Sequence, residues 1–153
     1  MGRSFAAAPL KSSDIEIAYA LIRAWHSRVS LDSWRGFAQA LIGNRAAHQG
    51  IIAIRNEAGY LCGLFVYRAE PDLHHGRALV VDPVAALDVI DVKPVVQAMV
   101  ETAEAMAGRF GCEVARFRIP APQSWLAEQL QGAGHHVEAN VLSTPVAFAM
   151  KPS

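Results

Sequence analysis

The chain has 153 residues, the usual size of one domain, and we expect residues 1–153 to form a single domain. With 52% hydrophobic and 18% charged residues, it is not a disordered chain. Fourteen Lys and Arg residues balance fourteen Asp and Glu residues, so a dedicated nucleic-acid-binding protein is not expected.

Cysteine usage and hydropathy indicate the cellular compartment of the protein. Cys62 and Cys112 are too few for a zinc site or a disulfide framework, and they are interpreted as reduced thiols. No apolar run approaches the roughly 20 residues that a membrane span needs, and the first residues lack the apolar core of a secretory signal. We therefore expect a cytoplasmic protein with no membrane partner.

The first third of the chain predicts a short strand and two helices. Residues 4–10 favour an edge strand. Ser13 and Glu16 have the spacing of a capping box, which indicates the start of a helix. A second helix is predicted over residues 31–42, and Gly43 ends it. The apolar face of the first helix comprises Ile15, Tyr19, Ile22 and Trp25.

The middle of the chain predicts strands. Residues 50–56 and 60–70 are rich in β-branched and aromatic residues and flank a turn, which is typical of a hairpin. Residues 77–86 predict a third strand. Pro83 lies within it and lacks a backbone donor, so we expect a bulge or a splayed edge at that position.

The last third predicts a long helix over residues 94–109, a strand over 114–119 and a short helix over 123–130. Two further strands are predicted over 137–140 and 144–150. The predicted order is β-α-α-β-β-β-α-β-α-β-β. This order indicates an α+β fold (layered α/β) with a mostly antiparallel central sheet and helices on both faces.

This order and its spacing resemble the Gcn5-related N-acetyltransferase (GNAT) family over nearly the whole chain. Residues 77–119 have the family's strand, loop, Ala-rich helix, Gly-Cys stop and strand. The hairpin over 56–68 and the helix-to-strand stretch over 125–139 also resemble the family. The resemblance implies transfer of an acetyl or other acyl group from acetyl-CoA or another acyl-CoA to a primary amine, on a small molecule or a protein.

The phosphate-binding loop departs from the family pattern. The family has Arg/Gln-x-x-Gly-x-Gly/Ala before the long helix, whereas residues 91–96 here contain no glycine. Pro94 donates no hydrogen bond, and Asp91 would repel phosphate. By the resemblance, Lys93 and the N–H groups of Val92, Val95 and Val96 would hold the phosphates.

The same resemblance implies that the pantetheine arm pairs, like an extra strand, with backbone groups around Leu87 and Val89 where two strands splay apart. These N–H groups could also polarise the thioester carbonyl. The family's tyrosine acid is replaced by Leu130, which donates no proton. His135 or His136 could substitute only if one of them turns inward.

Two carboxylates are candidates for the general base that takes the proton from the amine. Asp82 and Asp88 lie along or after the third predicted strand, next to the expected thioester. The alternative for each is a turn or bulge residue with its side chain in water. Trp34 is a candidate substrate-binding residue, with helix packing as its alternative.

No metal site is expected, because the adjacent histidine pairs at 74–75 and 135–136 would point to opposite faces of a strand. A homodimer is plausible through the last strands. The losses in the phosphate loop and at the acid position favour an alternative function. In that alternative, the chain is a catalytically inactive GNAT-like domain that binds a ligand or a protein.

Overall fold

The computed structural model describes residues 3–44 and 48–146. The chain forms two compact units, one up to Ala121 and one from Pro122 onwards. The first unit contains β1 (Ala6–Pro9), α1 (Ile15–Trp25), α2 (Leu31–Gly43), β2 (Gln49–Arg55), β3 (Leu61–Asp72), β4 (Gly76–Ala86), α3 (Lys93–Arg109) and β5 (Val114–Phe117). The second contains α4 (Ser124–Gly132).

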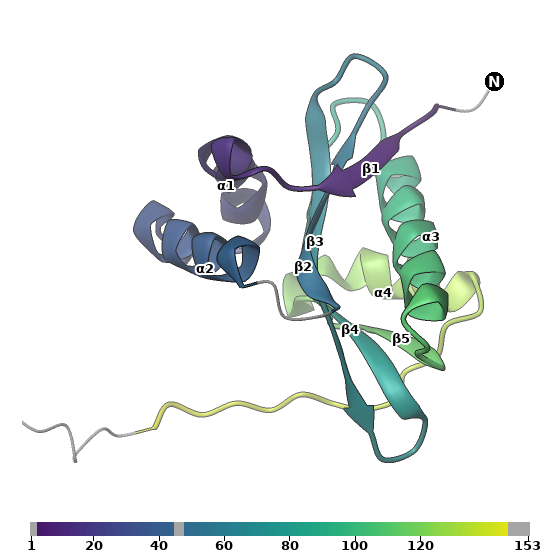
Figure 1. The fold of residues 1–153 in the computed structure, drawn as a ribbon. Coiled ribbons are helices and arrows are strands. Elements are labelled where there is room, and N and C mark those ends of the chain that lie inside the picture. Colours follow the sequence, from purple (N-terminus) through teal and green to yellow (C-terminus); the bar gives the residue numbers. More distant parts are fainter. Residues whose placement is uncertain (1–2, 45–47, 147–153) are drawn as a thin grey trace, which may run out of the picture. The chain divides into compact units, whose positions relative to one another are not determined.

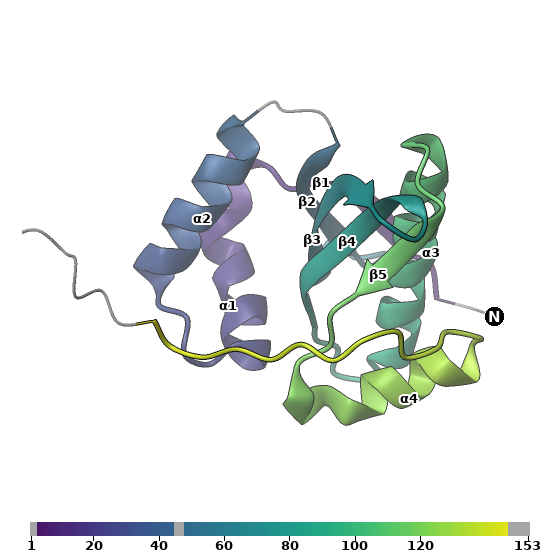
Figure 2. The same cartoon turned by 90° about the horizontal axis from the view of Figure 1, so that it is seen from below.

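The first unit is a five-stranded sheet covered by helices on both faces. The strands are ordered β1-β2-β3-β4-β5, with antiparallel pairs up to β4 and a parallel pair between β4 and β5. Figures 1 and 2 show α1 and α2 on one face and α3 on the other. The predicted α+β fold with a mostly antiparallel sheet is confirmed in this unit.

Runs of consecutive buried residues mark the central strands as covered by helices on both faces. In β2, β3 and β4 nearly all the central residues are buried, as expected for strands covered on both faces. Gly63 lets α3 approach β3 closely, because a Cβ at this position would lie 2.9 Å from Val95 Cγ1 and 3.1 Å from Met99 Sδ. The first turns of α3 are thereby held against the sheet.

Two sequence predictions need correction. The helix start at Ile15 is preceded by a short 3-10 turn and has no side-chain cap at Asp14. The expected capping box does not form there, because Glu16 accepts hydrogen bonds from Arg35 and Asp14 accepts one from Arg55.

The strand predicted over 137–140 is the second correction. Residues 135–146 form neither helix nor strand, and the rest of the final predicted strand, residues 147–150, lies outside the described residues. An alternating pattern marks a segment that can pair, but a strand exists only beside a partner.

In the part of the chain that the structure describes, no helix is long and apolar enough to cross a bilayer.

Candidate functional site

Strands β4 and β5 stop pairing halfway along β4. Their parallel register ends at Val81 opposite Phe117, and the last hydrogen bond runs from the Arg118 N–H to the Val81 carbonyl at 3.2 Å. On its other side, β4 remains paired with β3 up to Ala86. Residues 82–86 of β4 therefore have a backbone neighbour in the sheet on one side only.

A bulge in β4 marks the point where the two strands diverge. The register with β3 shifts there, so that Asp82 and Pro83 of β4 lie opposite the single residue Val66. Pro83 has no N–H and cannot take part in a regular ladder at this point. The irregularity predicted at Pro83 is confirmed.

The bulge decides which backbone groups face away from β3. Leu87 donates its N–H to the Cys62 carbonyl at 2.8 Å, so Leu87 faces β3. In an antiparallel pair, alternate residues turn both backbone groups to the same side. Val84 and Ala86 therefore direct their N–H and C=O groups away from β3. We call these groups the free edge of β4.

Side chains from the end of α1 occupy the two carbonyls of the free edge. Trp25 donates its Nε1–H to the Ala86 carbonyl at 2.6 Å, and His26 Nε2 lies 3.1 Å from the Val84 carbonyl. Because a carbonyl only accepts, His26 must carry its hydrogen on Nε2. The N–H groups of Val84 and Ala86 are left unpaired within the sheet, so the free edge presents donors.

Asp82 lies at the point where β4 and β5 diverge. Its carboxylate is 3.4 Å from Arg118 Nη1, and its side chain is 33% exposed. Arg118 directly follows β5, so this ion pair joins the two strands where their backbone pairing ends. An accessible carboxylate next to the free edge can attract a cationic amine and accept a proton from it.

Asp88 has a different environment. Its carboxylate accepts from Arg3 Nη1 at 2.7 Å and Nη2 at 2.8 Å, and from the N–H groups of Ile90 and Asp91. The Arg3 guanidinium, followed by these backbone donors, holds the pKa of Asp88 well below its usual range. Its side chain is only 6% exposed. This environment argues against the general-base role predicted for Asp88.

The β4–α3 loop, residues 87–92, satisfies many of its own donors. Asp88 takes the N–H groups of Ile90 and Asp91, and Asp91 Oδ1 takes the N–H of Lys93 at 3.1 Å. The N–H of Val96 donates to the Val92 carbonyl as the first bond of α3. These backbone donors at the start of the helix are thus already engaged.

These bonds bear on two of the predicted cofactor contacts. The N–H groups of Leu87 and Val96 are not available to a ligand, because they donate to Cys62 and Val92. Val95 is fully buried, at 0% exposure, whereas Val89 is fully exposed outside the strand. Spacing along a regular strand would turn the backbone groups of Leu87 away from β3, and the bulge shifts this phase by one residue.

Trp34 lies in the packing between α1 and α2. Its side chain is 2% exposed, and its Nε1–H donates to the Ile15 carbonyl at 2.7 Å. A buried ring whose polar group is already paired offers no surface to a ligand. The structure therefore argues against Trp34 as a substrate-binding residue and favours the packing alternative.

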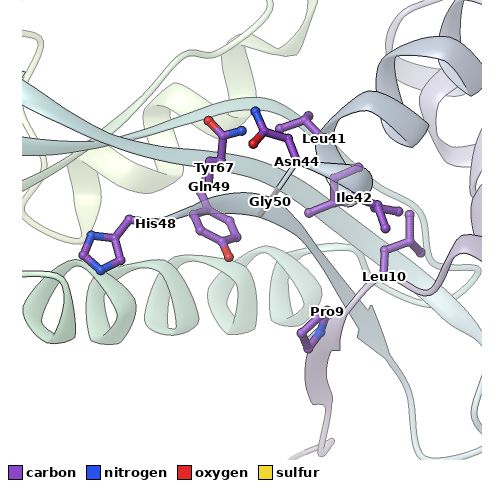
Figure 3. Close-up of a pocket in the computed structure, with 10 residues that line it drawn as sticks. Pro9, Leu10, Leu41, Ile42, Asn44, His48, Gln49, Gly50 and Tyr67 are labelled. Carbon is purple, nitrogen blue, oxygen red and sulfur yellow. The ribbon is translucent and has the colours of Figure 1, made fainter. Parts of the chain in front are cut away.

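A separate open pocket of about 350 Å³ lies where β1, α2, β2 and β3 meet (Figure 3). Its polar lining includes Asn44, His48, Gln49 and Tyr67. Burial raises the pKa of the Tyr67 hydroxyl. None of the residues predicted for catalysis or cofactor binding lines this pocket.

His135, one of the two histidines considered as a substitute acid, is engaged at the end of its helix. His135 Nδ1 lies 3.0 Å from the Leu130 carbonyl at the end of α4. Across residues 3–44 and 48–146, no group of three or more His, Cys, Asp or Glu side chains could hold a metal ion. The candidate site is therefore the free edge of β4 with Asp82 beside it.

Three residues that bind this site or the loop after it were not predicted: Arg3, Trp25 and His26. Each is more than 55 positions away in the sequence from the group it binds. No local pattern connects an N-terminal arginine, or the end of a helix, to a strand that follows so much later. Only the fold brings them together.

Comparisons with known proteins bear on the fold. No family model matches the sequence, and no curated protein matches it. Among solved structures, the aminoglycoside N-acetyltransferase AAC(6')-Iy in complex with CoA is similar, with a TM-score of 0.79 and 11% identity over 95% of this chain and 97% of that one.

Two further structures agree. Ribosomal-protein-alanine N-acetyltransferase from Brucella melitensis has a TM-score of 0.73 and 16% identity over 94% of this chain and 100% of that one. Glucosamine-6-phosphate N-acetyltransferase from Arabidopsis thaliana has a TM-score of 0.66 and 14% identity over 95% and 99%. Over about 95% of its length, the chain is therefore similar in structure to the GNAT acetyltransferases.

Proposed function

We propose that this protein is an acyl-CoA-dependent N-acyltransferase that transfers an acetyl or other acyl group to a primary amine. The acceptor is a small molecule or a protein amine. The observation that carries the proposal is the free edge of β4, with two unpaired N–H donors where β4 and β5 diverge. The fold shared with acetyltransferases supports it.

The pantetheine arm of the donor pairs with this edge as an added strand would. Its carbonyl groups accept from the N–H groups of Val84 and Ala86. Where the thioester carbonyl is the group that accepts, the N–H stabilises the negative charge that develops on its oxygen. Trp25 and His26 hold the strand in register by binding the two carbonyls.

The chemical step is a direct attack. The amine nitrogen bonds to the thioester carbon and forms a tetrahedral intermediate, which collapses with cleavage of the C–S bond. Asp82 accepts the proton lost by the amine, and the thiolate leaves and takes a proton from water. The enzyme mainly positions the two reactants, so few special side chains are required.

Donor binding is the first test of this proposal. Saturating acetyl-CoA, at about a hundredfold over its Kd, should stabilise the protein by about 2.7 kcal/mol and raise its Tm. Thermal unfolding with acetyl-CoA, with CoA and with longer acyl-CoAs measures this effect, and ATP serves as a nucleotide control. If none of the thioesters raises Tm, the proposal is wrong.

A second candidate function is a GNAT-like domain that binds a ligand or a protein without transfer. The β4–α3 loop favours it, because several of its donors are already paired within the chain. A panel of primary amines with detection of released thiol separates the two. Release of CoA thiol that depends on the amine supports transfer, whereas binding without release supports the second candidate.

A further inference from the structure

We infer that the donor is recognised through its acyl-pantetheine part, and that the diphosphate of CoA adds little to binding. This inference rests on the proposed function and deepens it, because it defines the class of donor. Its basis is the β4–α3 loop, where the chain's own carboxylates take the backbone donors that would otherwise face an anion.

The position of the loop follows from the strand. An arm laid along Val84 and Ala86 cannot continue toward Val81, because β5 pairs with β4 there. The rest of the donor must therefore lie toward the other end of β4. That end leads directly into residues 87–92 and the first turn of α3. The groups attached to the far end of the arm would meet this loop.

An anion in this place would find few free donors. The first N–H groups of a helix, together with its dipole, form a general anion site. Here the N–H of Lys93 is bound by Asp91 Oδ1 at 3.1 Å, Pro94 has none, and the N–H of Val96 is bound by the Val92 carbonyl.

The charges around the β4–α3 loop also disfavour binding of a diphosphate. The Asp91 carboxylate already occupies the acceptor position at the helix start, so a diphosphate would have to displace it or approach a like charge. The guanidinium of Arg3 is engaged by Asp88 and by the Asp91 carbonyl. Val89 and Ile90 are 100% and 80% exposed, so much of the loop surface is apolar.

The test compares two donors that share the reacting part. Acetyl-CoA carries the diphosphate and nucleotide, whereas S-acetylpantetheine ends at the arm. We expect their kcat/KM values, measured by thiol release with one amine, to agree within about tenfold, because no charge-assisted bonds to phosphate are gained. Isothermal titration of each donor gives the same comparison for Kd.

Asp91→Ala tests the cause. It frees the N–H of Lys93 and removes a negative charge, so acetyl-CoA should gain about three- to tenfold in kcat/KM while S-acetylpantetheine stays unchanged. Asp91→Asn keeps the acceptor oxygen. It should raise the ratio of the kcat/KM for acetyl-CoA to that for S-acetylpantetheine by a smaller factor. Asp32→Ala on α2, with a side chain 92% exposed, is the matched control for net charge and should leave the ratio unchanged.

The outcomes separate this inference from the proposed function. A wild-type preference for acetyl-CoA above about tenfold would overturn the inference alone, because it requires favourable phosphate contacts. An unchanged ratio in Asp91→Ala would also overturn it. If neither donor binds or reacts, the proposed function fails and this inference fails with it.

Discussion

Replacing Asp88 by alanine is expected to lower the free energy of unfolding by about 1–3 kcal/mol, because the Arg3 guanidinium and two loop N–H groups lose their shared, largely covered acceptor. Asp88 joins two separate parts of the unit: it binds Arg3 near the N-terminus and the N–H groups of Ile90 and Asp91 in the β4–α3 loop. Without it the loop should loosen. Chemical denaturation measures the loss of stability.

The pH dependence gives this prediction its control. The pKa of Asp88 is lowered in the folded state, so its contribution is present above the unfolded value of about 4 and is lost as the pH falls further. Asp88→Asn should therefore flatten the loss of stability below about pH 4. If the free energy of unfolding of Asp88→Asn falls below about pH 4 as steeply as that of the wild type, the assigned contacts are contradicted. Asp32→Ala should change stability by less than about 0.5 kcal/mol.

Replacing Asp82 by asparagine is expected to lower kcat by about a hundredfold or more, because the attacking amine loses its proton acceptor. The KM for the donor should stay close to that of the wild type. The donor is held by backbone N–H groups of Val84 and Ala86, which this substitution does not remove. Steady-state kinetics with acetyl-CoA and one amine measure both quantities.

Arg118→Gln is the matched control for Asp82. It breaks the same ion pair while keeping the carboxylate, so kcat should fall less than about tenfold. Equal losses in the two variants would mean that the ion pair, rather than proton transfer, is what matters. A kcat near the wild-type value in Asp82→Asn would show that another group takes the proton.

The spacing of apolar residues predicted the helices and the paired strands, because the buried face of each element is set by residues close together in the sequence. The apolar face around Ile15 and Ile22 and the hairpin before Pro71 are examples. The bulge at Pro83 was also predicted, because a missing N–H is a local property. The strand expected over 137–140 failed, since no local pattern supplies a partner.

The candidate site depends on details that sequence spacing does not contain. Spacing led to the region of Leu87, yet the bulge moves the free N–H groups to Val84 and Ala86. Asp88 has the right residue type for a base, but Arg3 lies 85 positions away and changes its chemistry. Contacts of this kind arise only when the sheet and the helices assemble.

The most direct measurement is a titration of the labelled protein with acetyl-CoA, followed by amide resonances in NMR. If the arm pairs with the free edge of β4, the amide signals of Val84 and Ala86 should shift strongly. The signal of Leu87, whose N–H is bound to Cys62, should move less. Saturable binding that leaves Val84 and Ala86 unmoved, with shifts gathered elsewhere, would contradict the account.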